Sequence, residues 1–111
     1  MAAVANLRID QGASFSSDVT VTNSEGTVVD LSGYTTEAKM AKSYGASTTT
    51  TITSNVASDA TTGVIELSLT DTQTAALDAP ARYVYDVYIT KTVDSTVTRV
   101  IEGVITVNPK V

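Results

Sequence analysis

The side chains that most often do chemistry in proteins are either absent from this sequence or placed where turns need them. The 111 residues contain no histidine and no cysteine, which removes the commonest general base, the commonest metal ligand and the thiolate nucleophile. Serines are plentiful, but no G-x-S-x-G nucleophile elbow occurs. Most aspartates fall in expected turns and strand ends, where a carboxylate caps backbone amides. We therefore expect no catalytic, cofactor or metal site, and no enzyme.

Two constellations of chemically capable residues remain as alternatives. Glu66 and Glu102 have the side-chain type that glycosidases use as an acid and base pair, but both fall on outward positions of expected strands. Tyr44 and Tyr88 are expected to be exposed, and exposed aromatic rings can stack on sugars. The second constellation would make the chain a receptor- or carbohydrate-binding module.

The charge balance argues against nucleic acid and membranes as partners. The net charge is −5 at pH 7, and no cluster of Lys and Arg is present to neutralise phosphates or anionic lipids. Residues 1–6 lack the basic start and apolar stretch of a secretory signal, and no apolar run approaches the roughly 20 residues that span a bilayer.

The elements that must position any site are predicted to be short strands, because apolar and polar residues alternate along much of the chain. Ile65 and Leu67 share one face of a strand that begins after Gly63, and Ile101 belongs to the inward face of a long last strand. Thr70 and Gln73 match the S/T-x-x-Q capping box, which predicts a short helix over residues 71–77.

About seven such strands, with turn signals every 8–12 residues, predict an all-β, immunoglobulin-like antiparallel β-sandwich. Tyr83 is expected to form its tyrosine corner, with its hydroxyl bonded back to the preceding turn, while Tyr85 and Val87 point into the core. A free N-terminal arm over residues 1–6 is expected to precede a single domain over residues 7–109.

The stretch from Ser43 to Thr62 has a different composition, rich in Ser, Thr and Ala, with Ile52 and Val56 as its only large apolar residues. A strand with neither face strongly apolar has a weakly specified register. We expect an edge hairpin or loop here, and a polar β-branched edge of this kind can accept another chain by strand addition.

Five blocks of sequence occur in an order that resembles a family of small β-sandwich virion structural proteins of tailed bacteriophages, particularly cyanophage-like ones. The resemblance extends from Leu7 to Pro109, except for the Thr-rich stretch from Ser43 to Thr62. Its blocks are Leu7–Phe15 (LRIDQGASF), Asp30–Tyr34 (DLSGY), Gly63–Thr70 (GVIELSLT) and the pair Arg82–Val87 (RYVYDV) with Arg99–Pro109 (RVIEGVITVNP).

The resemblance implies a non-enzymatic decoration or adaptor protein that is located in the virion after synthesis in the host cytoplasm. Such a protein docks on other virion proteins, of the capsid or of the tail and baseplate, through sheet edges and loops. It is present in many symmetric copies. The family has no catalytic residues to transfer to this chain.

Overall fold

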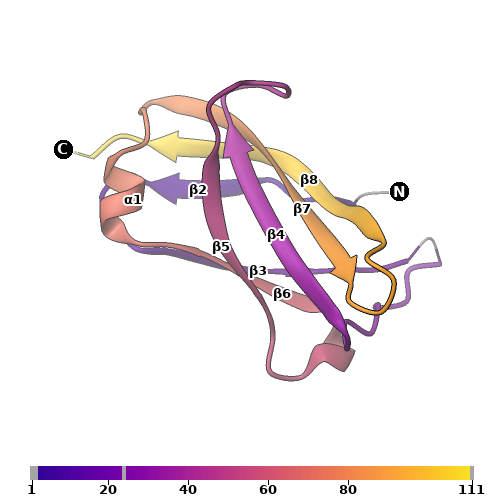
Figure 1. The fold of residues 1–111 in the computed structure, drawn as a ribbon. Helices are drawn as coiled ribbons and strands as arrows, with labels where there is room; N and C mark the ends of the chain where they lie inside the picture. Colours follow the sequence, from indigo (N-terminus) through magenta and orange to yellow (C-terminus); the bar gives the residue numbers. More distant parts are fainter. Residues whose placement is uncertain (1–2, 24, 111) are drawn as a thin grey trace.

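The computed structural model describes residues 3–23 and 25–110, which fold almost entirely into β-strands (Figure 1). In chain order the elements are β1 (Ala3–Val4), β2 (Leu7–Asp10), β3 (Phe15–Thr20), β4 (Tyr34–Ala41), β5 (Thr50–Val56), the 3₁₀ turn η1 (Ala60–Thr62), β6 (Val64–Leu69), α1 (Asp71–Ala75), β7 (Ala81–Lys91) and β8 (Val97–Asn108).

The strands form one continuous mixed sheet that curls into a barrel-like wall. Its order is β1–β8–β7–β4–β5–β6–β3, and β2 also pairs with β8. β1 and β2 run parallel to β8, and the other pairings between strands are antiparallel. The all-β prediction is confirmed, whereas the expected sandwich of two separate sheets is wrong, because hydrogen-bonded β4 and β5 join the two halves.

β5 is the strand that connects the two halves of the sheet, because it pairs with both β4 and β6. Its first part pairs with β4, from Ile52 opposite Ala38 to Thr50 opposite Met40, and its second part pairs with β6. β4 and β5 therefore lie together near the loop that connects them and diverge at their other ends (Figure 1). The edge hairpin expected over residues 43–62 is wrong, because β5 lies in the middle of the strand order. The alternative, a loop, describes only part of this stretch, since residues 42–49 connect β4 to β5.

A single apolar core fills the barrel, and the alternation of the sequence explains it. Along β6, along β7 and along β8 from Ile101 onward, the odd-numbered positions point inward, so buried residues alternate with exposed or half-buried ones. The largest fully buried side chains come from both halves of the sheet: Tyr85, Ile9, Leu31, Met40, Ile52, Ile65, Leu67, Ile101, Ile105, Val21, Val87 and Val107.

The predicted short helix is confirmed as α1, although it ends at Ala75 rather than at Leu77, and it contacts the turn between β2 and β3. Thr70 and Gln73 form the capping box with two reciprocal hydrogen bonds. Thr74, on the inner side of the helix, is 0% exposed. Its hydroxyl donates to the Ala13 carbonyl at 2.9 Å and accepts from the Gly12 N–H at 3.0 Å. These bonds tie α1 to the turn at one end of the barrel.

The expected free N-terminal arm is wrong for its described part. β1 lies parallel to β8, with Ala3 opposite Ile101, and the Ala5 N–H donates to the Glu102 carbonyl at 2.9 Å. Gly103 makes this close approach of the chain to β8 possible, because a Cβ at that position would collide with the Ala5 carbonyl. Met1 and Ala2, which also belong to the expected arm, lie outside the described residues.

Candidate interaction site

β3 is hydrogen-bonded along one side only. It pairs with β6 throughout its length, and the N–H of Val21 continues the ladder to the Gly63 carbonyl at 2.7 Å. Successive residues of a strand point their backbone groups to opposite sides, so those of Ser16, Asp18 and Thr20 point away from β6. Among residues 3–23 and 25–110 no strand pairs with that side, and all three residues are exposed. β3 is therefore an open sheet edge.

The outer face beside this edge has two carboxylates that face each other. Asp18 lies directly opposite Glu66 on β6, and Asn55 on β5 is the next residue in the row. Both acids are exposed, and neither makes an ion pair with a described residue. Like charges directly opposite each other in a sheet are destabilising. The repulsion between Asp18 and Glu66 is therefore not offset by a cationic side chain among the described residues.

Basic residues are confined to one half of the barrel. We call β3, β5 and β6 the acidic wall, because neither residues 9–38 nor residues 43–81 contain any Lys or Arg. β4 has one basic residue, Lys39, and the other basic residues lie on β2, β7 and β8 or just beyond strand ends. The seven are Arg8, Lys39, Lys42, Arg82, Lys91, Arg99 and Lys110. A cationic partner would thus meet an unbalanced negative potential only on one side.

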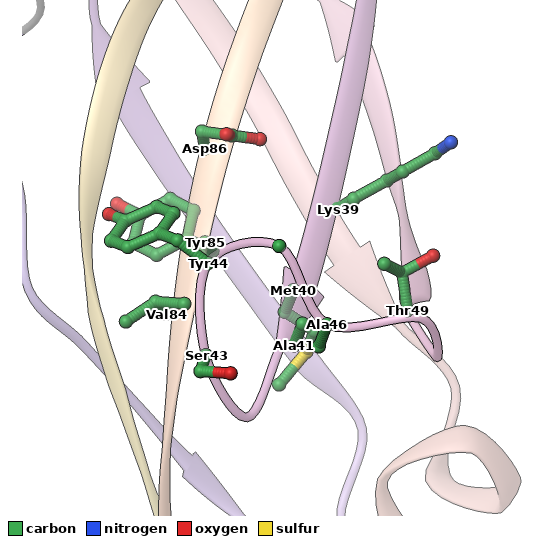
Figure 2. Close-up of a pocket in the computed structure, with 11 residues that line it drawn as sticks. Lys39, Met40, Ala41, Ser43, Tyr44, Ala46, Thr49, Val84, Tyr85 and Asp86 are labelled. Carbon is green, nitrogen blue, oxygen red and sulfur yellow. The ribbon is translucent and has the colours of Figure 1, made fainter.

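A second surface lies on the outer face of β7, where the loop between β4 and β5 returns to the sheet. Tyr44 in this loop reaches toward β7 beside Tyr85 and Val84, and Lys39 extends away from it (Figure 2). The loop and strands enclose a hollow of about 190 Å³, with Asp86 in its wall. Ligand pockets usually have about 300–1,000 Å³, so this hollow is small for an organic ligand.

Charged side chains of both signs cover the rest of this face. One row across the sheet runs from Glu37 through Tyr88 to Arg99, and the next from Lys39 through Asp86 to Glu102. Ion pairs connect the rows, with Lys39 Nζ 3.6 Å from Glu37 Oε1 and Arg99 3.2 Å from Glu102. Exposed pairs of this kind contribute roughly 0–1 kcal/mol each.

Asp86 is the perturbed group of this surface. Partial burial raises the pKa of its carboxyl, the Arg99 guanidinium opposes this rise, and the carboxylates of Glu102 and Glu37 add to it. Tyr44 and Tyr88, which are far apart in sequence, both lie near Asp86, since Tyr88 follows it by two residues on the same face and Tyr44 lines the same hollow. The fold therefore brings the two tyrosines to one face of β7, where Tyr44 is exposed as expected and Tyr88 is half-buried.

Tyr83 and Tyr85 anchor segments at the barrel end and at β1. The Tyr83 hydroxyl accepts a hydrogen bond from the Asp78 N–H at 2.9 Å, in the preceding turn. Lys42 lies 5.5 Å from the Tyr83 ring centroid and 2.6 Å from the Asp78 carboxylate. The Tyr85 hydroxyl donates to the Ala5 carbonyl. Burial, with a smaller contribution from nearby Tyr44, raises the pKa of Tyr85 to about 12.

The other predicted core residues lie in the interior of the barrel, on both halves of the sheet. Val87 and Ile65 are 0% exposed, and Leu67 and Ile101 are 1% exposed. They are therefore out of reach of any ligand, and their contribution is to packing.

Glu66 and Glu102 do not come together. Glu66 projects outward from the acidic wall, and β5, β4 and β7 separate its strand from β8 in the sheet order. No group of three or more acidic residues that could hold a metal ion is present in the described parts of the chain.

The open edge at Asp18 was missed by sequence reasoning, which placed the edge in the Thr-rich stretch. The absence of basic residues from 9–38 and 43–81 was visible in the sequence. Which strands share a wall was not, because the pairing of β3 with β6 joins residues nearly 50 positions apart.

Comparison with protein families and with curated proteins finds no match for this chain. Over the residues described, none of the helices has the length and apolar character needed to cross a membrane.

Proposed function

We propose that this protein is a non-enzymatic structural component of a bacteriophage virion, a small decoration or adaptor protein that docks on capsid or tail proteins. The observation that carries the docking function is the open edge of β3, whose backbone groups at Ser16, Asp18 and Thr20 are left for another chain. Added strands supply main-chain hydrogen bonds as the source of affinity, without a pocket or a reactive group. The virion assignment is supported by the ordered sequence blocks from Leu7 to Pro109.

The surface chemistry of the described residues agrees with a docking function. The charged groups over β7 are engaged in exposed ion pairs, and the hollow beside Tyr44 is small. By contrast, β3 has unpaired backbone groups at alternate positions along its six residues. Six residues is a typical length for a strand in a sheet.

Quantitative mass spectrometry of purified phage particles from the source of the chain tests this proposal. We expect the protein to co-purify with the particles in a fixed ratio to the major capsid or tail protein, and to remain after a high-salt wash. Its absence from the particles would contradict the proposal. If the protein is present, a cryo-EM map of the particle would show the location and symmetry of the bound copies.

A second candidate function is a receptor- or carbohydrate-binding module, favoured by the placement of Tyr44 and Tyr88 on one face of β7 around Asp86. Tyrosine rings can stack on sugars while Asp and Lys bind sugar hydroxyls. Glycan-array binding that is lost in Tyr44→Ala and in Tyr88→Ala, and kept in Thr90→Ala on the next outward position of β7, would favour this function over the first.

A further inference from the structure

We propose that the open edge of β3 binds an extended basic segment of a partner protein, which adds as a new strand and places its lysine or arginine side chains over Asp18 and Glu66. This inference rests on the proposed docking function and names the chemistry of the partner. It is carried by two independent features of the same strand, the unpaired backbone and the unbalanced charge.

The backbone fixes where the segment binds. Ser16, Asp18 and Thr20 each offer an N–H and a C=O on the side away from β6. A strand on that side bonds to alternate residues, and its own side chains alternate between the outer face and the core side of the sheet. Phe15 of β3 is half-buried and packs against the core, so apolar residues of the segment suit its inward positions.

The charge fixes what binds. An added strand extends the row Asn55–Glu66–Asp18 by one residue on the same outer face. A cationic side chain there relieves the repulsion between the two carboxylates, since opposite charges across strands are stabilising and like charges destabilising. The acidic wall has no Lys or Arg of its own to do this.

The same charge disfavours a second copy of the chain as the occupant. Two β3 edges in contact would bring two Asp18 and two Glu66 side chains together, and each copy has a net charge of −5. Charged residues on edge strands are a recognised means of preventing such self-pairing. Asp18 therefore selects a basic partner and rejects its own copies.

A synthetic peptide in which lysine alternates with valine is the probe, with glutamate in place of lysine in the matched control. We expect the lysine peptide to bind, the glutamate peptide to bind at least about tenfold more weakly, and added salt to weaken the lysine peptide. In amide hydrogen exchange by NMR, the N–H groups of Ser16, Asp18 and Thr20 should exchange quickly in the free protein and become protected with the peptide.

Two variants test separately the contributions of the β3 backbone and of the Asp18 charge to peptide binding. Ser16→Pro removes an outward N–H and blocks the edge while sparing the ladder to β6, because proline is tolerated on the open side of edge strands; it should abolish binding. Asp18→Lys should weaken binding about tenfold and reverse the preference toward the glutamate peptide. Glu25→Lys, in the exposed loop after β3, makes the same charge change away from the edge and should bind normally.

Protection elsewhere on the sheet, equal affinity for both peptides, or unchanged binding by folded Ser16→Pro would each overturn the inference. Self-association of the free protein that Ser16→Pro abolishes would identify a second copy as the occupant instead. Incorporation of Ser16→Pro into particles at the wild-type ratio would leave the virion function standing and remove the edge as its docking site. Absence of the wild-type protein from particles would remove the virion function, whatever the peptide result.

Discussion

The β7–β8 hairpin and β5 line the same core, but their positions are determined in different ways. β7 and β8 pair with each other from Ala81 opposite Val107 to Thr90 opposite Val97, with one register shift after Val87. Their inward residues are buried from Tyr83 to Ile89 and from Ile101 to Val107. β5 has one fully buried residue, Ile52, and divides its pairing between β4 and β6. A hairpin with apolar residues at alternate positions over most of its length specifies its own register, whereas the position of a polar strand depends on its neighbours.

A buried charge in the hairpin should have the largest effect. Val87 is 0% exposed, and an unpaired carboxylate there costs several kcal/mol against roughly 5–15 kcal/mol of total stability. We expect Val87→Asp to abolish the cooperative thermal transition followed by circular dichroism. Thr53→Asp places the same charge on an exposed position of β5 and should leave the midpoint nearly unchanged. Cooperative unfolding of Val87→Asp at the wild-type temperature would show that the faces are reversed.

This contrast also explains how much of the fold the sequence could predict. The inward positions of β6, β7 and β8 follow from alternation, and α1 follows from the Thr70–Gln73 capping box, because these signals are local. The closure of the sheet depends on the pairing of β5 with both β4 and β6, and the Thr-rich strand has no apolar periodicity that would indicate two partners.

The candidate site could be predicted only in part for the same reason. The exposure of Tyr44 could be predicted from the sequence, and the uneven distribution of basic residues is visible there. β3 has an open edge because it is the last strand in the order of the sheet. Which strand is last depends on long-range pairing and not on the sequence of β3 itself. The placement of β1 likewise depends on a glycine, Gly103, that lies nearly 100 residues away from it in sequence.

Removing the one anchor of β5 should have the next largest effect. Ile52 is 1% exposed, and truncating a buried isoleucine to alanine costs about 2–5 kcal/mol. If β5 depends on its neighbours, Ile52→Ala should lower the free energy of unfolding in urea and, before global unfolding, increase amide exchange in residues 50–56 more than in β7 and β8. Equal loss of protection in both regions would contradict the difference between them.

A methyl group at Gly103 tests the inward face of β8, where Ala5 and Tyr85 lie against the glycine. A Cβ there would meet the Ala5 carbonyl and, at 3.0 Å, the Tyr85 ring. Overpacking of this kind typically costs about 1–3 kcal/mol, and relief by moving β1 would break the Tyr85 hydrogen bond to Ala5. We expect Gly103→Ala to lower the thermal midpoint and to shift the NMR signals of residues 3–6. Gly26→Ala should give no packing clash, because nothing lies within 4 Å of that position. Any loss of stability in Gly26→Ala therefore comes only from the positive φ of this residue.

Deleting the Tyr83 hydroxyl should have a smaller effect at the start of β7. Tyr83→Phe keeps the buried ring but leaves the Asp78 N–H without its acceptor, a loss of about 1 kcal/mol. The free energy of unfolding in urea measures it. Tyr34→Phe changes a hydroxyl for which no hydrogen bond is seen among the described residues and should be nearly neutral. Equal effects of the two changes would mean that the Tyr83 bond adds no stability.

The smallest expected effect compares two carboxylates, Asp86 on β7 and Asp30 in the turn before β4. Burial raises the pKa of Asp86, so the folded state holds its proton more tightly than the unfolded state. Stability from this group is therefore full below the unfolded pKa of about 3.9 and is lost as the pH rises through the folded pKa. Hydrogen bonds from the Ser32 side chain and backbone lower the pKa of Asp30, so its contribution is present above the unfolded pKa and lost as the pH falls.

The two asparagine variants should accordingly have opposite pH dependences. Relative to wild type, the thermal midpoint of Asp86→Asn should rise as the pH increases from about 3 to about 7, because the variant lacks the cost of a partly desolvated carboxylate. That of Asp30→Asn should fall over the same range. Both shifts should be small, because both groups are in contact with solvent. Parallel curves for the two variants would show that Asp86 is as well solvated as a turn carboxylate, and that the outer face of β7 offers no desolvated surface to a ligand.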